Sequence, residues 1–144
     1  MDRESIYAAL FAKVKGATNF TLAERKLYPM ANISIDQMPA VLQLEFEETV
    51  EKKKGHPAKY TMNPKLWLYA TVANSGGYAS VALNGLLDAI TNALAPGADE
   101  IQDLGLPDLV NDCRIEGKIE IYEGDLGMTC EAIVPITIIA TSIN

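Results

Sequence analysis

The sequence predicts a single α+β domain over residues 1–144, with a mainly antiparallel sheet, two helices packed on one face, and a protruding hairpin or arm. Two segments carry apolar residues at the spacing of an amphipathic helix. The segments between and after them carry the alternating apolar and polar residues of half-buried strands. The length suits one ordinary domain, and no linker or internal repeat divides the chain.

The first helix is expected over residues 2–15, because Asp2 is a suitable N-cap and apolar residues recur at every fourth position after it. Residues 18–28 then suggest a strand. A second helix is expected to begin with Ser80 as its N-cap and to end before Pro96, since a broad apolar stripe lies between them. The order helix, three strands, helix, two strands is typical of an α+β domain.

The arm is predicted by the segment that follows the first loop. Residues 39–51 form a strand whose apolar side includes Phe46 and whose polar side includes Gln43. Residues 51–57, EKKKGHP, form a charged tip, and extended structure resumes after it. Pro64 cannot donate a hydrogen bond to a strand ladder, so it marks an edge, a bulge or a break in the second strand.

Residues 114–138 predict a closing hairpin. Both apolar sides face the core only if odd-numbered residues pair with even-numbered ones. Pairing Glu123 with Met128 satisfies this and leaves the four-residue loop 124–127, a common hairpin length. The expected core side then consists of Ile115, Ile119, Ile121, Met128, Cys130, Ala132, Val134, Ile136 and Ile138.

The same register separates the two cysteines. Cys113 lies opposite Ile138, and Cys130 lies opposite Ile121, eight residues further along the strand. Their sulfurs are then about 26 Å apart, at about 3.3 Å per residue. That is beyond the reach of a disulfide, so both are expected to be small core residues in a reducing compartment.

The second face of the hairpin is neither uniformly polar nor uniformly apolar. In the predicted register Glu120 lies opposite Glu131, and Ile133, Pro135 and Ile139 follow further along. Contiguous apolar residues on an outer face indicate an interface. The alternative is that a helix or the N-terminal strand of the same subunit covers them.

Charge is divided unevenly along the chain. Residues 1–87 carry ten Lys/Arg and eight Asp/Glu, a net charge of +2, whereas residues 88–131 carry eleven acids and two bases, a net charge of −9. This distribution disfavours a nucleic-acid grip, which needs a basic stripe. It allows the basic region of one subunit to meet the acidic region of the next, or simply keeps the protein in solution.

The residues indicate no catalytic, cofactor or metal site. The single histidine, His56, lies in the charged tip without metal-binding partners nearby and without a nucleophile-elbow motif. The glycine-rich segment 74–80 lacks the spacing of a phosphate-binding or dinucleotide-binding loop. No apolar run approaches the ~20 residues that span a membrane. The N-terminus has no secretory-signal pattern, so the chain is expected to stay in the cytoplasm where it is made.

Four segments resemble the tail terminator (tail-completion) proteins of long-tailed bacteriophages, the minor tail protein U class. They are RESIYAALFAKV, KLWLYATVAN, LNGLLDAITNALAP and RIEGKIEIYEGDLG…AIVPITI, and they follow the order and spacing of that family. The resemblance implies a sheet backed by two helices. It also implies a hexameric ring at the head-proximal end of the virion tail, assembled in the host cytoplasm. Such a ring caps the tail tube, stops its polymerisation, and presents a surface to head-completion or neck proteins.

In such a ring, an acidic wall would let phage DNA pass through the lumen without specific binding, because carboxylates repel phosphates. Residues 88–131 would supply part of the lumen or of a contact with an adjoining ring. The charged tip transfers no role by motif alone. Two other readings stay open: a different head–tail connector, such as a neck or head-closure protein, and a small unrelated enzyme. The candidate interface residues are Lys52, Lys53, Lys54, Glu116, Lys118, Glu120, Asp125, Glu131, Ile133 and Ile139.

Overall fold

The computed structural model describes residues 2–28, 32–74, 77–124 and 127–141. The elements in chain order are α1 (Arg3–Lys15), β1 (Leu22–Glu24), η2 (Ile35–Gln37), β2 (Ala40–Glu51), β3 (Lys59–Thr71), η3 (Val72–Asn74), α2 (Ala79–Ala93), β4 (Val110–Ile115), β5 (Glu120–Glu123) and β6 (Thr129–Thr141). Among the described residues, no helix is long and apolar enough to span a membrane.

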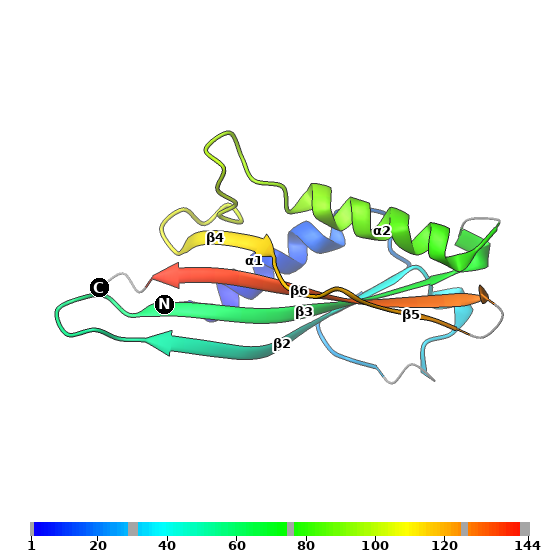
Figure 1. Cartoon of the computed structure of the whole chain (residues 1–144), viewed down its shortest axis with the longest axis horizontal. Coiled ribbons are helices and arrows are strands. Elements are labelled where there is room, and N and C mark those ends of the chain that lie inside the picture. The colour runs from blue at the N-terminus through cyan, green and yellow to red at the C-terminus, as the bar shows by residue number, and fades with distance from the viewer. Residues whose placement is uncertain (1, 29–31, 75–76, 125–126, 142–144) are drawn as a thin grey trace.

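The strands form one sheet in the order β1-β2-β3-β6-β4, and β5 pairs with β6 beyond the end of β4. β1 runs parallel to β2, and the remaining described pairs are antiparallel. Both α-helices lie on one face of the sheet (Figure 1). β2 and β3 form the predicted arm as a long hairpin, with β6 beside β3 as far as Lys59, and only the loop that connects β2 to β3 projects past the end of the sheet. The predicted fold class is therefore confirmed.

The main core fills the space between the helices and the sheet. Asp2 caps α1 as predicted, because its carboxylate accepts a hydrogen bond from the backbone N–H of Ser5 at 3.0 Å. The apolar stripes of both helices then face the middle strands β3 and β6. The largest fully buried side chains of this core are Ile6, Leu10, Met62, Leu66, Leu68, Leu83, Ile90, Ile136 and Ile138.

A second, smaller apolar cluster lies on the other face of the sheet. There Ile33 and Met38 cover Leu42 of β2 and Tyr69 of β3. The first half of β2 is consequently buried on both faces, and the prediction that Gln43 belongs to a polar, solvated side is wrong. Its side chain is 2% exposed and its amide donates a hydrogen bond to the carbonyl of Tyr7 in α1 at 3.0 Å.

A bulge interrupts the arm where Pro64 sits in the central strand β3. The register shifts between Leu44 and Glu47 of β2, which face Lys65 and Asn63 of β3. Of the three roles predicted for the proline, the bulge is the one observed. Phe46 has a positive φ of 62° at this shift and is 56% exposed, so its predicted place on the buried, apolar side is wrong.

Two element boundaries differ from the prediction. The strand expected over 18–28 is reduced to Leu22–Glu24, because only these residues pair with β2. The second helix begins at Ala79, with Tyr78 as its N-cap residue, so Ser80 lies inside the helix rather than at its cap. Serine is a favourable N-cap, but the position of the helix is decided by the apolar face that packs on the sheet.

The closing hairpin has the predicted register at one end and a different one at the other. Cys113 pairs with Ile138 as predicted, and both cysteines are buried free thiols. Glu123, however, pairs with Cys130 rather than Met128. Glu120 accordingly lies opposite Ile133 rather than Glu131, and Cys130 does not lie opposite Ile121.

The offset arises between β4 and β5. Four residues separate Ile115 from Glu120, whereas only two separate their β6 partners Ile136 and Ile133. Gly117 accommodates the two extra residues with a φ of 114°, a backbone angle that residues other than glycine rarely adopt. Because the surplus is even, each face of β6 keeps its predicted character.

β5 nevertheless lies at the margin of the helix-covered core. Three of the expected core residues are exposed: Ile119 at 38%, Ile121 at 52% and Met128 at 49%. Their assignment to the core is wrong. The side of the strand was predicted correctly for Ile121, which lies beside Ala132, but its burial was not.

Candidate functional site

The face of the sheet opposite the helices is only partly covered by its own chain. Ile133, Pro135 and Ile139 lie on this face and are half-buried. Both helices pack on the other face, and β1 lies in the sheet at its far edge, so neither covers them. Of the two alternatives left open by the sequence, cover by a helix or by the N-terminal strand of the same subunit is therefore not the one observed.

Glu131 lies on this face near the start of β6. It is flanked by Tyr69 on β3 and by Tyr122 on β5, which are its register partners on the two sides. Burial raises the pKa of the Glu131 carboxyl, and the hydrogen bond with the Tyr69 hydroxyl opposes that shift. The same burial, together with the charge of Glu131, raises the pKa of Tyr69.

A second carboxylate joins this group from the same strand as Tyr122. The Tyr122 hydroxyl donates to Glu120 Oε2 at 3.3 Å, and Glu120 is diagonal to Glu131 in the register. The charge of Glu120 raises the pKa of Tyr122, and Glu131 adds to the effect. Ile133 lies between Glu120 and Trp67 of β3. The structure thus brings together three of the predicted residues, and it adds tyrosines that the sequence reasoning did not include.

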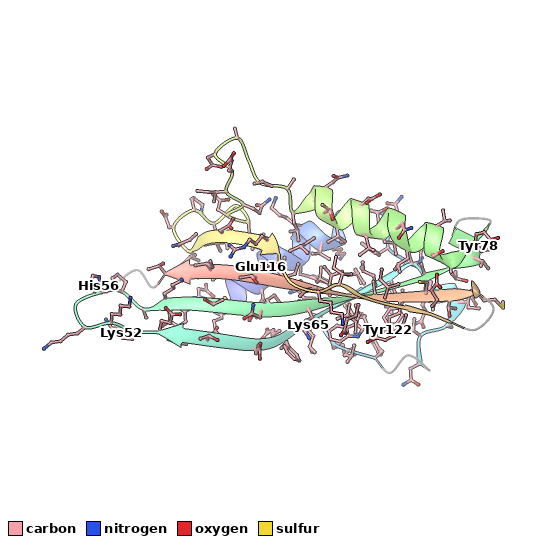
Figure 2. The ribbon with its side chains drawn as sticks, in the orientation of Figure 1. Lys52, His56, Lys65, Tyr78, Glu116 and Tyr122 are labelled. Carbon is pink, nitrogen blue, oxygen red and sulfur yellow. The ribbon has the colours of Figure 1, made fainter. Side chains whose placement is uncertain are left out.

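The other predicted residues of the closing segment lie elsewhere. Ile139 is six residues from Ile133 along β6, about 20 Å away. Glu116 is exposed and forms an ion pair with Arg114 at 3.0 Å (Figure 2). Lys118 is exposed in the link between β4 and β5. Asp125 lies outside the described residues.

The three lysines of the charged tip lie at the end of the arm. Lys52, Lys53 and Lys54 are all exposed, and Figure 2 shows Lys52 and His56 at the extremity of the molecule. The Lys52 ammonium donates to the His56 carbonyl, while the His56 N–H donates to the Lys53 carbonyl at 3.0 Å. The tip is therefore a turn held by its own hydrogen bonds, with the Lys52 ammonium bonded to its carbonyls.

Two exposed aromatic side chains were missed. Phe46 stands on the bulge, with the Lys65 ammonium 4.1 Å from its ring centroid. Tyr78 is 74% exposed before α2, at the opposite end of the molecule from the tip (Figure 2). The alternation in 39–51 assigned Phe46 to the buried side, and only the bulge reverses that. Tyr78 follows a glycine pair, a position that indicates a surface turn but no function.

The described residues contain no group of three or more His, Cys, Asp or Glu placed to hold a metal ion. An open hollow of about 410 Å³ lies between the end of α2 and β4, lined largely by apolar atoms together with Asp112 and Arg114. These two residues are bound to each other, with a Nη1–Oδ2 distance of 2.9 Å.

Comparison with known proteins bears on the fold. No protein-family model and no curated protein matches the chain. A solved structure titled "Virion of native gene transfer agent (GTA) particle" contains a chain with the same fold. This fold occurs in a virion. The match covers 95% of this chain and 92% of that chain, with a TM-score of 0.51 and 12% sequence identity. At this identity, the likeness is one of fold.

Proposed function

We propose that the protein is a structural component of a phage virion. In this proposal it forms a ring, most simply a hexamer, at the head-proximal end of the tail tube. The ring stops tube polymerisation and provides the attachment surface for head-completion or neck proteins. The observation that carries the proposal is the fold shared with a virion chain across almost the whole length of both proteins.

The distribution of surfaces supports a ring subunit. A ring is built from heterologous contacts, so each subunit needs two different surfaces at separate places. The arm tip and the open face around Glu131 differ in shape and charge, and they lie far apart on the sheet. Strands that pack on the core with one face only are suited to such contacts, because apolar side chains on their other face are still partly exposed.

The charge pattern supports a passage for DNA rather than a grip on it. Each of the three arginines is engaged within the chain: Arg3 with Glu48, Arg25 with Glu4, and Arg114 with Asp112. Guanidinium groups held in this way are poorly available for phosphate. A lumen wall rich in carboxylates would let DNA pass without sticking.

The test uses the purified protein and its cognate tube protein. Negative-stain microscopy of the protein is expected to show six-fold rings, and adding it to polymerising tube protein is expected to shorten the tubes and cap one end. A monomer at all concentrations that leaves tube length unchanged would refute the proposal.

The shared virion fold also suits a neck or head-closure protein. Labelled electron microscopy of virions separates the two functions. Label between tube and neck supports the tail terminator. Label against the portal, with no effect on tube length, supports the other connector.

A further inference from the structure

The arm tip, residues 52–58, is a compact basic element. It carries three lysines and no acid, and all of its residues except Ala58 are exposed. None of the three lysines forms an ion pair with any residue that the structure describes. The turn is fixed by the hydrogen bond from the His56 N–H to the Lys53 carbonyl, by the bond from the Lys52 ammonium to the His56 carbonyl, and by Gly55 with its φ of 80°. A preorganised turn of this kind presents its charges with little ordering cost.

A complementary surface lies around β5, which we define as residues 119–123 together with Glu131. β5 pairs only with β6, so within the described chain its outer edge has no strand partner. Ile121 and Tyr122 are each 52% exposed and lie on opposite faces of the strand. Three glutamates accompany them, and none forms an ion pair with a described residue: Glu120, Glu123 and Glu131.

The tip cannot reach the β5 surface of its own chain. Lys59, at the base of the tip, pairs with Thr141 of β6, whereas Ile121 pairs with Ala132 of the same strand. Nine residues of extended chain separate these levels, about 30 Å at about 3.3 Å per residue. The tip and Tyr122 are well separated along the molecule in Figure 2. A contact between the two charge groups must therefore join two molecules.

We propose that the arm tip of one subunit docks on the β5 surface of the next copy of the chain. The inference rests on the proposed ring and names one of its contacts. The tip wraps around the free edge of β5. Its lysine ammonium groups meet the glutamates, and the lysine stems cover Ile121 on one face of the strand and Tyr122 on the other. Because the two surfaces differ, the contact is heterologous and repeats from subunit to subunit, as a closed ring requires.

The test exchanges the charges of the two surfaces. One variant reverses the tip (Lys52→Glu/Lys53→Glu/Lys54→Glu). Another reverses the β5 surface (Glu120→Lys/Glu123→Lys/Glu131→Lys). A third carries all six changes. The control reverses two exposed lysines away from both surfaces, Lys15→Glu/Lys26→Glu. Sedimentation velocity and negative-stain microscopy report the rings at low and high salt, and circular dichroism verifies the fold.

Each single-surface variant is expected to weaken assembly at least tenfold at low salt, because like charges then face each other. Rings are expected to be recovered by the variant with all six substitutions and by an equal mixture of the two single-surface variants. In the mixture the two kinds of subunit alternate, so every contact is again between opposite charges. The control is expected to assemble like the wild type, and high salt is expected to weaken the wild-type contact.

The outcomes separate this inference from the proposed function. Intact rings in the tip-reversed variant, or no recovery in the mixture, would overturn the inference and leave the ring standing. If the β5-reversed variant forms intact rings that no longer stop tube growth, the inference is overturned too, and the β5 surface is assigned to contact with the tube protein. A wild-type protein that forms no ring under any condition would overturn both.

Discussion

Replacing Ile138 and Ile121 by alanine in separate variants compares two residues that the sequence assigned to the same core side. The structure separates them: Ile138 is 0% exposed and Ile121 is 52% exposed. Each substitution removes three carbon atoms. At about 0.8 kcal/mol per buried methylene, the loss at Ile138 is about 2.4 kcal/mol before the cavity is counted. With the cavity it falls within the range of about 2–5 kcal/mol typical of such changes.

Ile121 is about half buried, so its replacement by alanine loses about half as much transfer free energy, about 1.2 kcal/mol, and leaves no closed cavity. In urea titrations, with a slope of about 2 kcal/mol per molar, the midpoint falls by about 1.5 M for Ile138→Ala and by about 0.6 M or less for Ile121→Ala. The titrations need dilute protein, since assembly would add its own stabilisation. Equal midpoints for the two variants would contradict the placement of β5 outside the core.

Three further predictions concern other features of the closing segment. Gly117→Ala should lower the free energy of unfolding by about 1–3 kcal/mol in urea titrations, because alanine is strained at this positive φ. The control is Gly85→Ala in α2, which has open space around it and should be neutral or slightly stabilising. Equal losses in the two variants would contradict the strain at Gly117. Burial raises the pKa of Glu131 above its usual value of 4.5. The stability that Glu131 contributes is therefore fully present at a pH below 4.5 and is lost as the pH rises through the raised pKa. In thermal melts at pH 4 to 7, the stability of Glu131→Gln relative to the wild type should increase with pH, and a constant difference would count against this. Cys113 and Cys130 should resist a thiol reagent at pH 8 in the folded protein and both react in denaturant, since burial raises the pKa of Cys113 to about 12 and also raises that of Cys130; rapid labelling of the native protein would contradict their burial.

The candidate site was only partly accessible from the sequence. Alternation along β6 identified Glu131 and Ile133 as neighbours on an outer face, and they are. The tyrosines beside Glu131 were not predicted, because Tyr69 is brought there by the pairing of β3 with β6 across some 60 residues of chain. No local pattern reports which strand will lie next to which.

The sequence by itself determined the features that depend on neighbouring residues. The span of α1 follows from its cap and its period, the arm follows from two extended segments around a charged turn, and the faces of β6 follow from strict alternation. These signals are local because backbone geometry sets periods of 3.6 and 2.0 residues directly.

Only the tertiary structure decided how much of each face is buried. The bulge at Phe46 and the surplus residues around Gly117 arise from the fit of one strand against another, and each changes what is exposed. Ile121 kept its predicted side, yet it stands at the margin of the sheet where neither helix covers it. Burial depends on the strand order and on where the helices end, and these are properties of the assembled sheet.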